Sequence, residues 1–316
     1  MTHTSPAALL KPRALRPGDR VAVISPASAF ARHQFDAGVE EIRRLGLEPT
    51  WDESVFARAA YVSGSPATRA AAFLQAWFDP SVAALIAVRG GYGSVHILPL
   101  LLPAELRRSP KAFIGYSDNT SLLTWLTCGC GIVGFHGPML EKRLAHGAHG
   151  YDRDSFERAL ARPEPMGELA PDGLVALQAG EAAGPIYGGT LTQLLASFNT
   201  PYAFDPPEGS ILFLEDVNER PYKLDRMLTQ LRLSGLLSRA RGIVFGEMRG
   251  CDEPGGQPCA RDVIAGVLSG FAGPIVYGFP SGHTTGPCWT LPLGVRTRVI
   301  AAGRPRIVIE EAAVVR

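Results

Sequence analysis

The chain has 316 residues, of which 46% are hydrophobic and 19% are charged. This length and balance exclude a disordered protein and predict two domains or one large α/β domain. Its 31 Lys and Arg residues against 30 Asp and Glu residues give a formal net charge of +1. A chain so close to neutrality has no overall field that would recruit nucleic acid or an anionic membrane, so we expect a small substrate.

The spacing of the cysteines and the length of the apolar runs indicate the cellular compartment in which the protein works. Five cysteines, an odd number, are scattered without a C-x-x-C pair, which argues against a disulfide framework and against a zinc site. The first 20 residues contain only a short apolar run before Pro and Arg, so no export signal is predicted. No apolar run reaches the roughly 18 residues that cross a bilayer. We therefore expect a cytoplasmic protein without a membrane segment.

In the first half of the chain, hydrophobic patterns of strands and helices alternate. Strands are predicted at 20–24, 82–88, 112–114 and 132–135, and helices at 35–45, 67–77 and 120–127. This alternation is typical of a parallel sheet with crossover helices. Ligands bind such sheets at the carboxyl ends of the strands.

A stretch rich in Pro and Gly marks the boundary between two predicted domains. We place an N-terminal domain at 1–165, a linker at 166–184 and a C-terminal domain at 185–316. Within the second domain, helices are predicted at 190–198 and 224–237, and strands at 210–214, 242–246 and 274–278. Short strands with turns are predicted for the last forty residues.

The segment AFIGYSDN at 112–119 has the pattern of a strand that turns sharply into a helix. Such a turn exposes a serine and places the helix N-terminus near developing negative charge, which makes Ser117 the candidate nucleophile. The alternative is that Ser117, Asp118, Asn119 and Thr120 only cap the helix. Asn119 also stands where the G-x-S-x-G elbow has its second Gly, so an ordinary α/β-hydrolase is not predicted.

A serine nucleophile needs a base, and the base needs a carboxylate that orients it. Two histidines follow predicted strands: His283, the candidate base, and His136, its rival. Each could instead be a structural imidazole. Glu215, at the end of a predicted strand, is the candidate carboxylate, with Asp216 and Glu219 as alternatives.

The glycine-rich segment RGGYG at 89–93 follows a predicted buried strand. Glycines let the backbone approach a ligand closely, and N–H groups at such a place can bind an oxyanion. A phosphate-binding loop is a second functional interpretation, although neither G-x-x-x-x-G-K-[ST] nor G-x-G-x-x-G is present. A tight connection without a ligand is the structural alternative.

Further motifs extend these segments along the chain: GDRVAVISPAS at 18–28, FHGPM at 135–139, GGTL at 188–191, LEDV at 214–217, PYKLDRML at 221–228, GH at 282–283 and TLPLG at 290–294. Together with RGGYG and FIGYSD, they resemble the LD-carboxypeptidase family of serine peptidases. This family includes murein tetrapeptide carboxypeptidases and microcin C immunity hydrolases. The resemblance covers most of the chain.

The resemblance implies an α/β fold with an N-terminal flavodoxin-like or amidotransferase-like parallel-sheet domain and a C-terminal β-rich α/β domain. It implies Ser117 as nucleophile, His283 as general base and Glu215 as orienting carboxylate. The backbone N–H groups of Gly91 and Asp118 are the implied oxyanion hole. The nucleophile and its two partners would come from different domains, and no metal or organic cofactor is implied.

The implied substrate is a small peptide, and the implied assembly is a homodimer. The murein branch releases the terminal D-alanine of the tetrapeptide in cell-wall recycling, and the LEDV and PYKLDR segments look closer to this branch. Arg89, Tyr92 and Trp289 are the candidate substrate-binding residues. A microcin-C-type hydrolase of aminoacyl or peptidyl adenylates, with Trp289 as a shelf for the base, is the first alternative. A non-catalytic nucleotide- or peptide-binding protein that uses the Gly91 loop is the second.

Overall fold

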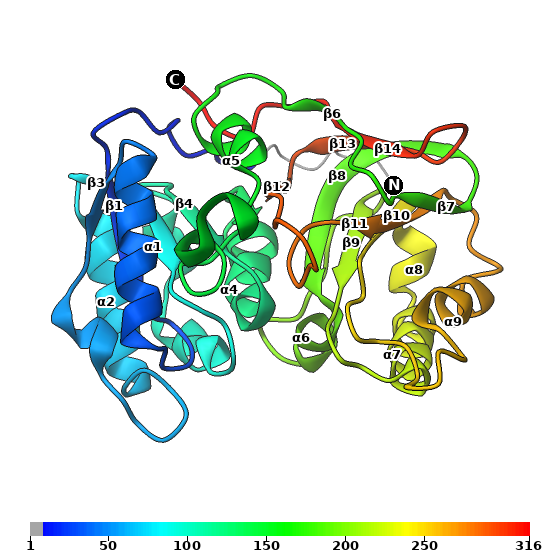
Figure 1. The fold of residues 1–316 in the computed structure, drawn as a ribbon, viewed down its shortest axis with the longest axis horizontal. Coiled ribbons are helices and arrows are strands. Elements are labelled where there is room, and N and C mark those ends of the chain that lie inside the picture. Colours follow the sequence, from blue (N-terminus) through cyan, green and yellow to red (C-terminus); the bar gives the residue numbers. More distant parts are fainter. Residues whose placement is uncertain (1–8) are drawn as a thin grey trace.

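The computed structural model describes residues 9–316, which form two sheets placed side by side (Figure 1). Residues 1–8, part of the segment in which no export signal is predicted, lie outside the described residues. Over 9–316, every helix is too short or too polar to cross a membrane.

The first sheet has six strands in the order β12-β5-β4-β3-β1-β2. Five of them are parallel, and β12 pairs antiparallel with β5. Their bounds are β1 (Arg20–Ile24), β2 (Glu48–Thr50), β3 (Val82–Ala87), β4 (Ala112–Gly115), β5 (Gly134–His136) and β12 (Leu291–Leu293). The central strands are almost continuously buried, as expected for a parallel sheet covered by helices. The predicted parallel sheet with crossover helices is therefore confirmed.

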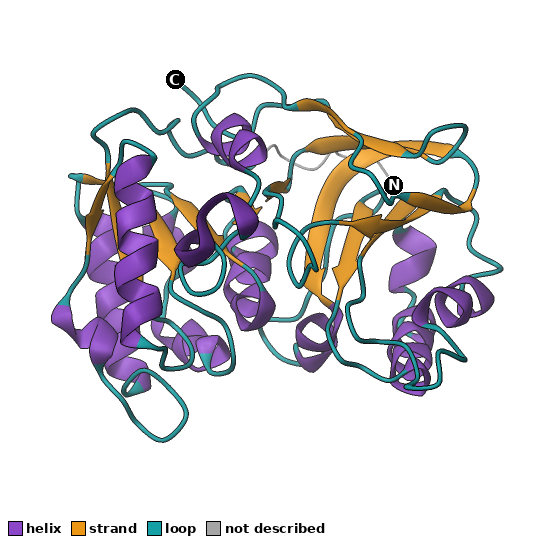
Figure 2. Ribbon diagram, viewed as in Figure 1, coloured by secondary structure: helices purple, strands orange, loops and turns teal. Residues whose placement is uncertain are grey.

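The helices that pack against this sheet include α1 (Arg32–Arg44), α2 (Pro66–Phe78) and α4 (Thr120–Thr124) (Figure 2). The predicted helix at 120–127 is thus shorter as an α-helix, because it continues as a π-helical turn, η4 (Trp125–Gly129). The remaining helical segments of this half are short: η1 (Glu53–Phe56), η2 (Ser94–Leu100), α3 (Pro103–Leu106), η3 (Ser117–Asn119), η5 (Leu144–His149) and α5 (Arg153–Leu160).

The second sheet has eight strands in the order β6-β14-β13-β8-β9-β10-β11-β7. Its centre is parallel, and its outer strands are antiparallel. The central strands are β8 (Glu181–Thr190), β9 (Ile211–Glu215), β10 (Gly242–Gly246) and β11 (Ile275–Phe279). The outer strands are β6 (Gly167–Leu169), β7 (Val175–Gln178), β13 (Arg296–Ile300) and β14 (Arg306–Ile309). A β-rich second half is thus confirmed.

The strand β9 divides its side chains between two cores. Ile211 and Phe213 belong to the large core shared with the first sheet, whereas Leu212 and Leu214 belong to a second core. This separation follows from the period of two along a strand. The second core is closed by α6 (Leu191–Ala196), α7 (Pro221–Leu233), α8 (Leu236–Arg239) and α9 (Ala260–Val267), of which α7, α8 and α9 gather at the lower right of Figure 1.

The segment at 166–184, predicted as a linker, contains strands in the structure. It contains β6 and β7 and the start of β8, so it forms part of the second sheet. The sequence does not reveal β6 and β7 because they are short edge strands of three and four residues with mostly half-exposed side chains. Conversely, β12, in the predicted C-terminal domain, crosses back to join the first sheet. The sequence analysis also missed three α-helices, α3, α5 and α9, and the strand β2.

Candidate active site

A cleft of about 400 Å³ lies where loops from both sheets meet. Every one of these loops follows the carboxyl end of a strand, which is where ligands bind in sheets of this kind. The lining residues follow β3 (Arg89, Gly90, Gly91), β4 (Tyr116, Ser117), β5 (Met139, Glu141, Lys142, Arg143, His146, His149, Gly150), β10 (Arg249) and β11 (His283, Thr284, Thr285).

Ser117 is the first residue of η3, at the tight turn that follows β4, and has a φ of 63°. A residue other than Gly adopts this left-handed conformation only when the surrounding structure enforces it, and such strain clusters at functional sites. Asn119 holds the turn, because its Nδ2 donates hydrogen bonds to the carbonyl oxygens of Arg89 (3.1 Å) and Tyr116 (3.3 Å). Within residues 9–316, Ser117 Oγ has no hydrogen-bond partner and is free to act on a ligand.

The alternative that these residues only cap a helix is wrong. Neither η3 nor α4 has a side-chain cap hydrogen bond. The carboxylate of Asp118 turns instead to a different segment, where its Oδ2 accepts a hydrogen bond from the Ser94 N–H at 2.8 Å. Ser94 Oγ donates in return to the Asp118 carbonyl at 2.6 Å. These two hydrogen bonds join the turn that contains Ser117 to the end of the glycine-rich loop.

The glycine-rich loop lies directly against Ser117. A Cβ placed on Gly90 would lie 2.9 Å from Ser117 Oγ and 3.1 Å from the Asp118 nitrogen. Gly91 has a φ of 94°, which favours glycine, and its N–H has no hydrogen-bond partner among the described residues. The loop is held from behind by the buried guanidinium of Arg69, which donates to the carbonyl oxygens of Gly93 (2.6 Å) and Gly64 (3.2 Å).

Glu215 and His283 are in direct contact. Glu215 Oε2 accepts hydrogen bonds from the backbone N–H of His283 at 3.0 Å and from its Nδ1 at 2.8 Å, and Oε1 accepts one from the Thr190 hydroxyl. A carboxylate only accepts, so Nδ1 carries the hydrogen and Nε2 keeps a lone pair. The imidazole, 19% exposed, reaches the cleft that Ser117 lines. This arrangement can activate a hydroxyl by general base catalysis.

Glu215 itself is fully buried, with 1% of its surface exposed. Burial opposes ionisation, but the charge of His283, its hydrogen bond and the lesser effects of His136 and Thr190 outweigh burial and lower the pKa of Glu215 to about 2. The carboxylate therefore stays charged at neutral pH and stabilises an imidazolium on His283.

The rival base, His136, lies behind the carboxylate and does not line the cleft. It is completely buried, its Nδ1 is 2.8 Å from Ser281 Oγ, and its Nε2 is 4.0 Å from Glu215 Oε1. Burial, reinforced by the charge of His283 and opposed by that of Glu215, lowers the pKa of His136 to about 4. His136 is thus a neutral imidazole beside the carboxylate.

The two alternative acids do not contact His283. Asp216 Oδ2 accepts hydrogen bonds from the N–H and the hydroxyl of Thr192, and its Oδ1 accepts one from the Val217 N–H. Burial and the charge of Glu215 raise the pKa of Asp216 to about 6. Glu219 forms a salt bridge with Lys223 at 3.1 Å.

Of the three candidate substrate-binding residues, only Arg89 lines the cleft. Its Nε is 3.3 Å from Glu141 Oε2, and its Nη1 donates to the Ala29 carbonyl at 3.1 Å. Tyr92 is 45% exposed and packs beside Tyr61. Trp289 packs edge-on against Phe279 at a centroid distance of 6.2 Å, outside the set of cleft-lining residues.

Several cleft residues were missed by the sequence analysis. Lys142, Arg143 and Arg249 bring positive charge to the cleft, which has Glu141 as its single acidic lining residue. For Lys142 and Arg143 the sequence offered one signal of a place in the cleft, because both come just after the FHGPM motif. For Arg249 it offered no such signal. The cleft is therefore suited to an anionic ligand. Over residues 9–316, no group of three or more His, Cys, Asp or Glu side chains could hold a metal ion.

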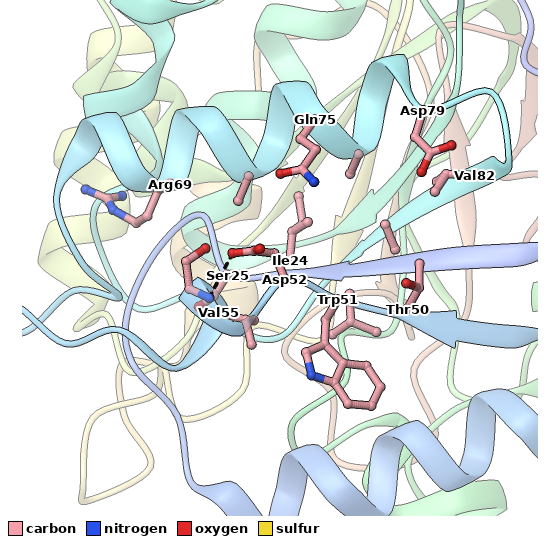
Figure 3. A pocket seen from close by; sticks show the side chains of 15 residues that line it. Ile24, Ser25, Thr50, Trp51, Asp52, Val55, Arg69, Gln75, Asp79 and Val82 are labelled. Atoms are coloured by element: carbon pink, nitrogen blue, oxygen red, sulfur yellow. Dashed lines mark hydrogen bonds between the residues drawn. The ribbon is translucent and has the colours of Figure 1, made fainter.

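A second pocket, of about 120 Å³, lies between β1 and α2 (Figure 3). It is lined by two serines, Ser25 and Ser54, and the Ser25 hydroxyl donates to Ser63 Oγ at 2.7 Å. Asp52, also labelled in the figure, accepts a hydrogen bond from the Ser54 N–H. None of its lining residues is a histidine, so this pocket does not offer a base to a serine.

Comparisons with known proteins agree over both halves of the chain. Residues 21–137 match the model of the LD-carboxypeptidase N-terminal domain, and residues 183–299 match that of the LD-carboxypeptidase C-terminal domain. A Streptomyces coelicolor protein named "Putative carboxypeptidase" is 36% identical, with 91% of this chain and 92% of the relative covered. A Bacillus subtilis protein named "Probable murein peptide carboxypeptidase" is 31% identical, with 94% of each covered.

A second kind of relative is similarly close. The microcin C7 self-immunity protein MccF of Escherichia coli is 27% identical, with 89% of this chain and 90% of the relative covered. Among solved structures, an MccF-like protein from Bacillus anthracis superimposes with a TM-score of 0.86 at 27% identity, covering 95% and 99% of the two chains. A muramoyltetrapeptide carboxypeptidase from Oxalobacter formigenes gives 0.79 at 27% identity, covering 92% and 97%.

Proposed function

Because this chain belongs to the LD-carboxypeptidase family, we propose that it is a serine-type carboxypeptidase that releases the terminal D-alanine from murein tetrapeptide during cell-wall recycling. The reaction is hydrolysis of an L,D-peptide bond. The observation that carries this proposal is the hydrogen-bonded Glu215–His283 pair, whose imidazole shares one cation-lined cleft with the strained Ser117. Relatives named as murein peptide carboxypeptidases support the substrate.

In the proposed mechanism, His283 Nε2 takes the proton of Ser117 Oγ as Oγ forms a bond to the scissile carbonyl carbon. The N–H groups of Gly91 and Asp118 hold the negative oxygen of the tetrahedral intermediate. The C–N bond then breaks, and the imidazolium gives its proton to the departing amine of D-alanine. Water, activated by the same imidazole, hydrolyses the acyl-enzyme and restores Ser117. Glu215 stabilises the imidazolium in both halves of the reaction.

The positive lining of the cleft supports an exopeptidase that binds the terminal carboxylate of its substrate. Arg89, Lys142 and Arg249 are the candidates for this contact, since each lines the cleft. Arg249 is the least constrained of the arginines, because it is exposed and its Nη1 lies at the long distance of 3.5 Å from the Thr284 carbonyl. Arginine pairs well with carboxylates through its fork of donors.

A microcin-C-type hydrolase is the alternative, and the structural match to an MccF-like protein favours it. The same cations would suit the acyl-phosphate linkage of an aminoacyl or peptidyl adenylate. Trp289 packs on Phe279 outside the set of cleft-lining residues, so its position does not support the role of a shelf for the base. A non-catalytic peptide- or nucleotide-binding protein is a third candidate function, and covalent labelling of Ser117 by a serine-directed phosphonate would argue against it.

The assembly and the compartment also belong to this proposal. A cytoplasmic homodimer rests on the family resemblance alone.

The test is mass spectrometry of murein tetrapeptide incubated with the wild-type protein and with Ser117→Ala. We expect loss of one D-alanine with the wild type and none with the variant. The matched control is Ser25→Ala, which removes a buried hydroxyl outside the cleft and should leave turnover unchanged. Cleavage of an aminoacyl-adenylate analogue, without cleavage of the tetrapeptide, would instead establish the alternative.

A further inference from the structure

Arg143 lines the cleft, yet each of its side-chain nitrogens already has a protein partner. Nη2 donates to the carbonyl oxygens of Gly282 (2.8 Å) and Thr284 (3.2 Å), and Nη1 donates to that of Gly286 (3.2 Å). Nε donates to the hydroxyl of Tyr116 at 3.2 Å. Only 9% of the residue is exposed. This side chain is therefore committed to the protein and is poorly placed to bind a substrate carboxylate.

The three carbonyl groups lie on both sides of His283. They belong to the loop that follows β11 in the second sheet, whereas Arg143 belongs to the segment that follows β5 in the first sheet. One guanidinium thus fixes the path of the base-bearing loop from across the boundary between the sheets. Glu215 constrains the imidazole itself, but it does so from β9, within the same sheet as the loop.

The fourth contact joins the same guanidinium to the nucleophile turn. Tyr116 immediately precedes Ser117, and its ring packs edge-on against the His283 imidazole, with centroids 5.0 Å apart and an interplanar angle of 79°. Burial, only partly offset by the charge of Arg143, raises the pKa of Tyr116 to about 12. The hydroxyl therefore stays neutral and can accept the hydrogen bond from Nε.

We propose that Arg143 is a positioning residue that holds the His283 loop against the turn bearing Ser117, and so aligns base and nucleophile across the two sheets. This inference rests on the proposed function, because it assumes that His283 activates Ser117. It assigns Arg143 no contact with substrate. A planar fork that binds several carbonyl groups at once cannot be replaced by the single ammonium of lysine.

The kinetic test compares Arg143→Met and Arg143→Lys with the wild type on murein tetrapeptide. Misalignment of reacting groups by about 1 Å costs on the order of 10²-fold in rate, so we expect kcat to fall about 100-fold in Arg143→Met. KM should stay within about threefold, and Arg143→Lys should recover only part of kcat, because its compact ammonium can donate to fewer of these carbonyl oxygens at once than the planar fork of arginine. Arg107→Met is the control: this exposed guanidinium binds the Cys130 carbonyl outside the cleft, and its loss should leave both constants unchanged.

A rise in KM with little change in kcat would overturn the proposal, because it would make Arg143 a ligand of the substrate carboxylate.

A crystal structure of Arg143→Met gives a readout that does not depend on the substrate. We expect residues 282–286 to move and the contact between Tyr116 and His283 to open, whereas an unmoved loop would also overturn the proposal. If the Met variant does not fold, the structure of Arg143→Lys serves the same purpose. If the wild type leaves the tetrapeptide intact, the proposed function fails, while the position of the loop still decides the role of Arg143.

Discussion

The Cα of Gly90 faces the side chain of Ser117 so closely that a Cβ on Gly90 would lie 2.7 Å from Ser117 Cβ. Two atoms cannot share this space, so any side chain at position 90 must displace Ser117 or the loop. The backbone of Gly90 does not have a positive φ in this structure, unlike that of Gly91. A substitution at Gly90 therefore tests the close approach without imposing a forbidden backbone conformation.

We expect Gly90→Ala to lower kcat by about 100-fold, since a shift of Ser117 by about 1 Å costs on the order of 10²-fold. Steady-state kinetics on the cleaved substrate measure the effect. Gly266→Ala is the matched control, because the new methyl group would meet nothing within 4 Å on the exposed side of α9. Full activity of Gly90→Ala would contradict the prediction that catalysis depends on this close approach.

The free energy of unfolding of Ser117 variants should reveal the backbone strain in the turn that contains this residue. Its φ of 63° is disfavoured for residues with a Cβ and is accessible to glycine. We expect Ser117→Gly to raise the free energy of unfolding by about 1 kcal/mol, and Ser117→Ala to leave it nearly unchanged. Urea denaturation measures both, and neither variant should turn over substrate. Equal stabilities of the Gly and Ala variants would mean that the turn stores no strain.

Substitution of the two neighbouring acids should separate their roles. Glu215→Gln keeps the shape but loses the charge that stabilises the His283 imidazolium, so kcat should fall by about 10²- to 10⁴-fold. Asp216→Asn should change kcat by no more than a few-fold, because Asp216 contacts Thr192 and Val217 and not the base. The same assay with both variants checks the assignment, and the reverse ranking would move the orienting role to Asp216.

His136 should make stability depend on pH below neutrality. Its pKa is about 4 in the folded protein against an ordinary value of 6.5, so the unfolded chain takes up the proton first as the pH falls. The contribution of this group to stability is complete above pH 6.5 and is lost as the pH falls from there through 4, about 3 kcal/mol in all. Between pH 7 and 4.5, the free energy of unfolding should therefore fall less in His136→Gln than in the wild type.

Urea denaturation at both pH values measures this difference. His33→Gln, which changes an exposed histidine of α1, is the control and should follow the wild type. Glu215 contributes in the same direction but at lower pH, since its pKa of about 2 places the loss of its contribution below pH 4.5. Asp216 acts in the opposite sense, because its pKa of about 6 makes its contribution decline as the pH rises from 3.8 to 6. Identical pH dependence of wild type and His136→Gln would mean that His136 is not held neutral.

Local patterns in the sequence predicted much of this molecule. The strands β1, β3, β4 and β9 and the helices α1 and α2 appear close to their predicted positions, because an apolar run or a helical period depends on residues near in sequence. The sharp turn at Ser117 was predictable for the same reason. The edge strands β6 and β7 were not, because they are paired by backbone hydrogen bonds with distant strands and carry no apolar alternation of their own.

The choice between His136 and His283 depends on how the two sheets pack. Both histidines follow strands, so local patterns predict only that each lies near a strand end. The packing of the two sheets then buried His136 behind Glu215 and brought His283 into the cleft with Ser117. The role of Arg143 depends on the same packing, since its partners Gly282 and Thr284 lie on a loop of the other sheet. Such contacts join residues far apart in the chain, so they follow from strand register and from the fit between domains, which a local sequence pattern does not encode.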